Sequence, residues 1–145
     1  MSFKVAIHNE NSEQVTLDEY TKINLEDLSE KQNASLKEIF VGDYLCFLDQ
    51  KEISETIDMV VSKMRYGAKL IISGYDIIEI CRTIMSRELA LNLAREFLYS
   101  GKISCYTHWE LVDMLQSRGL KISRKILEGP EYTIIMERPD VAKKE

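Results

Sequence analysis

The chain has 145 residues, of which 45% are hydrophobic and 30% charged, and its formal net charge is −5. This length gives room for one domain, and the acidic balance argues against broad binding to nucleic-acid phosphates. No apolar run approaches the roughly 20 residues that cross a bilayer, and the polar opening segment argues against a signal peptide. Three widely spaced cysteines favour buried thiols in a reducing, cytoplasmic compartment.

The first 42 residues predict three short strands. The apolar segments 3–7 and 20–24 are strand candidates, and the polar stretch between them has no clear pattern. Residues 24–35 are polar and loop-like, with room for one helical turn after Ser29. The β-prone apolar run that follows predicts a buried strand over residues 37–42.

The segment 51–66 has the clearest helical pattern. Its apolar residues form one stripe, Asp49 and Glu52 resemble a capping box, and Gly67 stands where a helix C′ residue is expected. The continuous apolar run 68–74 then predicts a strand that is covered on both faces, as in a parallel sheet.

The second half of the chain predicts helices followed by a strand pair. Residues 76–99 keep helical spacing but lose phase near Ser86, which indicates two helices. A capping box at 107–110 opens another helix, and Gly119 closes it. The strands 120–127 and 132–138 must be antiparallel because the turn between them is too short for a crossover.

The order and spacing of these elements resemble one large family. The segment around KMRYGAKLII (63–72) is similar to the turn that feeds the fifth strand of class I S-adenosylmethionine-dependent methyltransferases. Residues 104–139 (SCYTHWELVDMLQSRGLKISRKILEGPEYTIIMERP) resemble the last helix and closing hairpin of the same family. The resemblance runs from about residue 36 to residue 138.

The resemblance implies an α/β fold. We expect a truncated Rossmann-like methyltransferase sheet, mostly parallel, with an antiparallel C-terminal hairpin and helices on its faces. Residues 1–139 would form a single methyltransferase-like domain, and residues 140–145 a flexible charged tail.

The glycine-rich turn that grips the cofactor in this family is missing. The chain has six glycines, no two of them within five residues of each other, so it contains no G-x-G turn. If segment 3–7 corresponds to the second strand of the family, Glu10 lies near the place of the ribose-binding acid. If segment 20–24 corresponds to the third, Asn24 replaces the adenine-reading acid, with Glu26 and Asp27 nearby. Solvated loop positions are the alternative for these four residues.

Four side chains are predicted to meet at the carboxyl ends of the strands. Asp43 and Tyr44 follow the strand 37–42, while Tyr75 and Asp76 follow the strand 68–74. Sheets of this kind bind ligands at that edge, so these residues could line a cofactor site. The alternative is that Asp49 and Asp76 simply cap the following helices.

Other reactive residues give weaker signals. His108 starts a helix and is a possible base, although an exposed incidental histidine is the plainer interpretation. Cys105 is a remote candidate nucleophile, and no spacing suggests a metal site. Arg118, Lys121, Arg124 and Lys125 form either a local basic patch or, as we favour, a solvated helix end and strand face.

Two hypotheses follow. The first is a methyltransferase-like protein without cofactor or catalysis, structural or partner-binding, of viral or mobile-element origin such as a phage. The second is an S-adenosylmethionine-dependent methyltransferase whose site is completed by another subunit. Because a missing first strand would leave an edge and a face uncovered, the strands at 38–42 and 68–74 would need a protein partner or a second copy.

Overall fold

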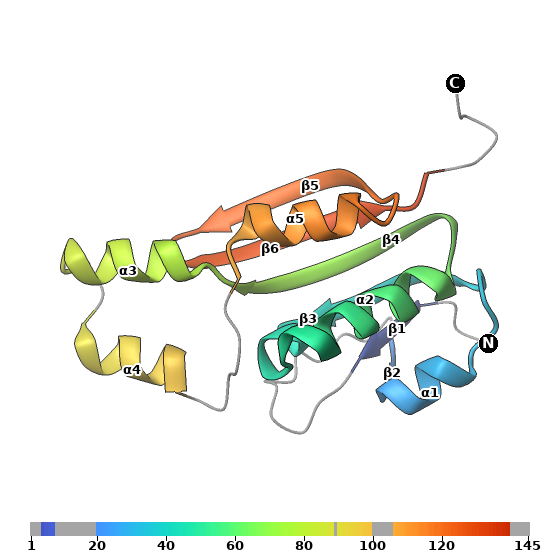
Figure 1. The fold of residues 1–145 in the computed structure, drawn as a ribbon, viewed down its shortest axis with the longest axis horizontal. Coiled ribbons are helices and arrows are strands. Elements are labelled where there is room, and N and C mark those ends of the chain that lie inside the picture. Colours follow the sequence, from blue (N-terminus) through green and yellow to red (C-terminus); the bar gives the residue numbers. More distant parts are fainter. Residues whose placement is uncertain (1–3, 8–19, 89, 100–105, 140–145) are drawn as a thin grey trace.

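A computed structural model describes residues 4–7, 20–88, 90–99 and 106–139 (Figure 1). The strands form one six-stranded sheet in the order β2-β1-β3-β4-β6-β5. The strands are β1 (Lys4–Ile7), β2 (Thr21–Ile23), β3 (Leu36–Gly42), β4 (Met64–Tyr75), β5 (Lys121–Glu128) and β6 (Glu131–Glu137). The helices are α1 (Leu25–Glu30), η1 (Tyr44–Phe47), α2 (Gln50–Lys63), α3 (Ile77–Met85), α4 (Leu91–Tyr99) and α5 (His108–Gln116).

The sheet is mostly parallel, as predicted. β2, β1, β3 and β4 pair in parallel, whereas β6 pairs in antiparallel fashion with both β4 and β5. Gly129 and Pro130 form the turn between β5 and β6, which confirms the predicted hairpin. The Rossmann-like α/β class with a closing antiparallel hairpin is therefore confirmed.

One face of the sheet is covered by helices α1, α2 and α5. Side chains from these helices and from alternate strand positions form one buried cluster, and Figure 1 shows α2 and α5 on the same side of the sheet. Arg118, which follows α5, also contacts α2, because its Nε donates to Asp58 Oδ1 at 2.6 Å and its guanidinium contacts the Ser54 hydroxyl. The fully buried side chains of the cluster include Leu28, Ile39, Ile53, Ile57, Leu70, Ile72, Leu111, Leu115, Ile134 and Met136.

The opposite face of the sheet is half-exposed. Along β4, Leu70 and Ile72 are buried on the helix side, whereas Lys69 is exposed and Ile71 only partly buried. Among the described residues no helix packs on this second face, because α3 and α4 lie beyond the carboxyl edge of the sheet (Figure 1). The prediction that the strand 68–74 is covered on both faces is therefore wrong for this part of the chain.

A row of alternating charges crosses the half-exposed face. Register pairs join residues of opposite sign from β1, β3, β4, β6 and β5, in that order, and opposite charges across strands stabilise a sheet. The first pair is an ion pair between Lys4 Nζ and Glu38 Oε2 at 3.5 Å. The row consists of Lys4, Glu38, Lys69, Glu137 and Lys121.

The two N-terminal strands occupy places that the resemblance did not suggest. β1 pairs directly with β3, and β2 pairs with the other side of β1. In the usual doubly wound order 3-2-1-4, the first strand is the neighbour of the fourth. β1, which pairs with β3, therefore fills the place of the strand that was expected to be missing. The strands 38–42 and 68–74 consequently have both edges paired, and the edge strands are β2 and β5.

Several local predictions need correction. The polar stretch after residue 24 contains helix α1, which starts earlier than expected because Asn24 Oδ1 accepts from the Asp27 N–H at 2.8 Å. Helix α2 ends at Lys63 rather than near residue 66, so Gly67 is not its C′ residue. Gly67 instead lies inside β4 with a φ of +79° and donates its N–H to the Arg138 carbonyl. Cys81 is exposed, although a buried thiol is the expectation.

Helices α3 and α4 form an arm beyond the carboxyl edge of the sheet (Figure 1). They confirm the predicted break near Ser86, and Arg87 has a positive φ of 63° there. Several of their apolar side chains are exposed, including Ile78, Met85, Leu91 and Tyr99. Within the described ranges, none of the helices has the length and apolar character needed to cross a membrane.

Lys63 joins the ends of α1 and α2. Its side chain is buried, and Nζ donates to the carbonyls of Ser29 and Lys31 at 3.2 and 2.6 Å and to Asn33 Oδ1 at 2.9 Å. Carbonyls at a helix C-terminus have no partner within the helix, and a nearby cation stabilises them. This ammonium therefore holds α1 in its place beside α2.

Replacing Lys63 tests this role. We expect Lys63→Met to lower the free energy of unfolding by about 2–3 kcal/mol, because buried acceptors lose a charged donor. Lys51→Met, an exposed change on the same helix, should cost less than about 0.5 kcal/mol. Equal effects of the two substitutions in denaturant titrations would contradict the role of Lys63.

Candidate functional site

The carboxyl ends of the parallel strands form the edge where sheets of this kind place ligands. Asp43 and Tyr44 follow β3, and Tyr75 and Asp76 stand at the end of β4, as the sequence predicts. Because β6 is antiparallel, its first residues, Glu131 and Tyr132, lie at the same edge. The four predicted residues therefore share one edge of the sheet.

Tyr44 does not line an open site. Its side chain is 9% exposed and belongs to the core cluster on the helix side of the sheet. Burial raises the pKa of the Tyr44 phenol, and the nearby Glu52 carboxylate raises it further to a smaller extent. Asp43 precedes helix η1, and its carbonyl accepts from the Cys46 N–H at 3.0 Å.

Asp76 is the most constrained of the four residues. It is 4% exposed, and Oδ1 accepts from the N–H groups of Ile78 and Glu79 at 2.9 and 3.3 Å, which caps α3. Oδ2 accepts from the His108 N–H at 3.2 Å, at the start of α5. Its own N–H donates to the Pro130 carbonyl in the β5–β6 turn at 2.8 Å. Asp76 thus joins β4, the starts of two helices and the hairpin. It caps α3, as the alternative interpretation of the sequence predicted, and it also contacts α5 and the β5–β6 turn.

A cleft of about 230 Å³ opens beside Asp76. Its walls come from the starts of α3 and α5, the end of β5 and the β5–β6 turn. The lining residues are Asp76, Glu79, His108, Leu127, Gly129, Pro130, Glu131 and Tyr132. Asp76 is the only residue of the predicted cofactor cluster that contributes to it, since Asp43, Tyr44 and Tyr75 are not among the lining residues.

His108 gives the cleft its distinctive chemistry. Its Nδ1 atom is buried and has no hydrogen-bond partner among the described residues, while its ring meets the Tyr132 ring edge-on at 6.4 Å between centroids. Burial and then the Lys125 ammonium lower the pKa of His108, although the Asp76 carboxylate raises it. The lowered pKa favours the neutral imidazole, whose Nδ1 can accept a hydrogen bond from a small donor when Nε2 carries the proton. His108 is half-buried, so the expectation of an exposed histidine is wrong.

Gly74 allows the Tyr132 side chain to lie close against the backbone of β4. A Cβ atom there would lie 2.7 Å from the Tyr132 hydroxyl and 3.5 Å from Cys46 Sγ. A residue other than glycine would push Tyr132 away from β4. No pattern in the sequence brought His108, Glu131 and Tyr132 together, although the capping box and the hairpin turn each point to this edge.

The remaining predicted residues do not join this site. Asn24 caps α1, and Glu26 and Asp27 are exposed in its first turn. Glu10 and Cys105 lie outside the described residues. In the part of the chain that the structure describes, no group of three or more histidine, cysteine, aspartate or glutamate residues could hold a metal ion.

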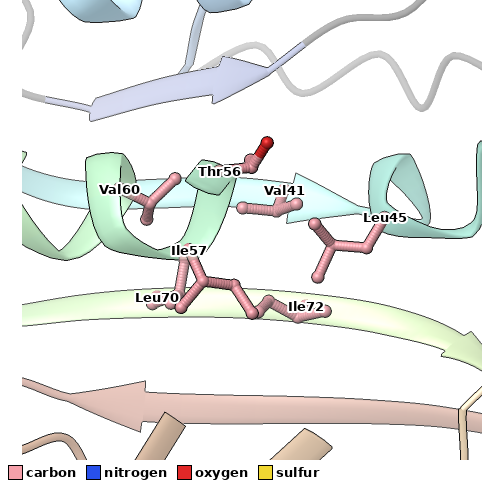
Figure 2. A pocket seen from close by; sticks show the side chains of 7 residues that line it. All are labelled: Val41, Leu45, Thr56, Ile57, Val60, Leu70 and Ile72. Carbon is pink, nitrogen blue, oxygen red and sulfur yellow. The ribbon is translucent and has the colours of Figure 1, made fainter. Parts of the chain in front are cut away.

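A second hollow lies inside the core and is not a ligand site. Figure 2 shows its apolar side chains converging between α2 and the strands β3 and β4. It leaves no room for a water molecule. It is lined by Val41, Leu45, Thr56, Ile57, Val60, Leu70 and Ile72.

Solved structures provide the comparison for this fold, since no family model and no curated protein matches the sequence. An S-adenosylmethionine-dependent methyltransferase from Methanosarcina mazei superposes with a TM-score of 0.58 at 18% identity, over 83% of this chain and 67% of its own. An O-methyltransferase family protein from Burkholderia thailandensis gives 0.59 at 13% identity, over 86% of this chain and 37% of its own.

A third similar structure is a complex. It contains the Haloferax volcanii Trm112 methyltransferase activator and the putative methyltransferase, and it matches with a TM-score of 0.58 at 8% identity, over 87% of this chain and 65% of the matched chain. This chain has a class I methyltransferase-like fold. The methyltransferase-like fold extends over most of the sequence, and the chain spans between about one third and two thirds of the length of these three proteins.

The bridging role of Asp76 predicts an unequal pair of substitutions. Asp76→Ala should lower the free energy of unfolding by about 2–3 kcal/mol, because it removes a helix cap and leaves the His108 N–H without its acceptor. Asp49→Ala removes the cap of α2 alone and should cost about 1 kcal/mol. Equal losses in urea titrations would show that Asp76 caps only one helix.

The environment of His108 predicts its titration. By NMR, the imidazole should titrate below the ordinary value of about 6.5, and Lys125→Gln should raise its pKa. With a lowered folded-state pKa, stability from neutral His108 is present above about pH 6.5 and falls as the pH drops through the folded-state value. Between about pH 6.5 and the folded-state pKa, the unmodified chain should therefore lose more stability than the His108→Gln variant. A pKa at or above 6.5 would contradict the buried environment.

Proposed function

We propose that this methyltransferase-like protein does not bind S-adenosylmethionine by itself and acts as a structural or partner-binding protein. The half-exposed face of the sheet is the observation that carries the proposal. Two further observations support it: the sequence lacks the glycine turn, and the residues predicted to bind a cofactor have structural roles.

The half-exposed face favours a partner. Phe40, Ile71 and Ile135 are neighbours in register across β3, β4 and β6, and each is only partly buried. The described helices lie on the other face or beyond the carboxyl edge. Covering apolar surface contributes about 25 cal/mol per Å², so a partner that covers this row would gain affinity.

The predicted cofactor residues favour a structural role. Both carboxylate oxygens of Asp76 accept hydrogen bonds from backbone N–H groups, and Tyr44 lies in the core. A methyl transfer requires the sulfonium to be held in line with its acceptor, and the sequence has no G-x-G turn to hold it.

A solved structure of similar fold also points toward a protein partner. The Haloferax volcanii methyltransferase of that structure occurs in complex with its Trm112 activator. We extend only the idea of a protein partner to this chain. A viral or mobile-element origin, such as a phage, stays a prediction from the resemblance.

Calorimetric titration tests the proposal. We expect no saturable heat with S-adenosylmethionine or S-adenosylhomocysteine at about 1 mM, the upper end of ordinary KM values. The Methanosarcina mazei protein serves as the positive control. Saturable binding that Asp43→Asn weakens would overturn the proposal and favour an enzyme whose site another subunit completes.

A further inference from the structure

The edge strand β5 is the most exposed strand of the sheet. Among the described strands it pairs on one side only, with β6, and seven of its eight residues are exposed. Arg124 stands opposite Ile135 on the half-exposed face, and Lys125 stands opposite Ile134 on the helix-covered face. The middle of this strand therefore carries a cation on each face.

Apolar side chains flank these cations. Ile122 is 37% exposed and Leu127 is 54% exposed, on either side of Arg124 and Lys125. An unpaired strand edge is a template for another strand, and side chains beside it decide which strand fits. The chain as a whole is acidic, with a net charge of −5, so this basic strand contrasts with the rest.

A second copy of β5 is disfavoured in the three central registers of this edge. In a two-fold antiparallel pairing, the middle of the strand meets itself. The three central registers place Arg124 against Lys125, Arg124 against its copy, or Lys125 against its copy. Directly opposed like charges destabilise a sheet.

We infer that β5 is a docking strand for an extended, acidic segment of a different protein, which adds to the sheet by β-augmentation. Carboxylates of the added strand would lie beside Arg124 and Lys125, and its apolar residues beside Ile122 and Leu127. This inference names a partner class for the partner-binding role proposed above and rests on it.

The probe is a capped ten-residue peptide with two central glutamates between alternating valines and threonines. We expect it to bind the full chain saturably, to shift the NMR signals of β5 amides, and to slow their hydrogen exchange. Arg124→Glu with Lys125→Glu should weaken binding about tenfold or more, because two attractive pairs become repulsive. The matched control, Lys37→Glu with Lys51→Glu, changes the net charge equally at exposed positions and should leave binding within about twofold.

Three results would overturn the inference. They are equal binding of a peptide with lysines in place of the glutamates, no effect on β5 amides at millimolar peptide, and a dimer formed through β5 in the free chain. Failure of this test is distinguishable from failure of the proposed function. The peptide reports on β5 alone, whereas cofactor heat in calorimetry bears on the proposed function alone.

Discussion

A single buried carboxylate, that of Asp76, holds the carboxyl edge of this sheet together. It accepts three backbone N–H groups from the starts of α3 and α5, and its own N–H joins β4 to the hairpin turn. The first N–H groups of a helix have no partner within the helix. Asp76 caps α3 and also accepts the His108 N–H, while Thr107 forms the capping box of α5. The position of His108 and the shape of the cleft beside it follow from this contact.

The second constraint is the unequal cover of the sheet. α1, α2 and α5 bury one face, while the other shows a charged row and an apolar row of partly buried side chains. The charged row allows part of that face to meet water, because neighbouring strands present opposite charges. In the apolar row beside it, the Phe40 ring lies 6.0 Å from the Tyr20 ring between centroids, and Ile71 and Ile135 are partly exposed. This asymmetry and the open edge of β5 are the observations that support the proposed protein partner.

The sequence predicted what local signals specify. The two capping boxes, the break near Ser86 and the short hairpin turn depend on residues a few positions apart, and the structure confirms all of them. Non-local features were harder. The place of β1 depends on pairing with β3, and the apolar run in β4 does not reveal which face a helix covers. Nor could spacing decide whether Asp76 binds a ligand or caps helices, since both uses require a carboxylate at the same point.

The most direct test of the central claim is native-state hydrogen exchange of the Asp76→Ala chain. The amides to compare are those of Ile80 and Leu111, in the first turns of α3 and α5, with Ile53 in α2 as the reference. If one carboxylate holds both helix starts, Ile80 and Leu111 should lose protection together while Ile53 keeps its own. Loss of protection at Ile80 alone would contradict the shared role of Asp76.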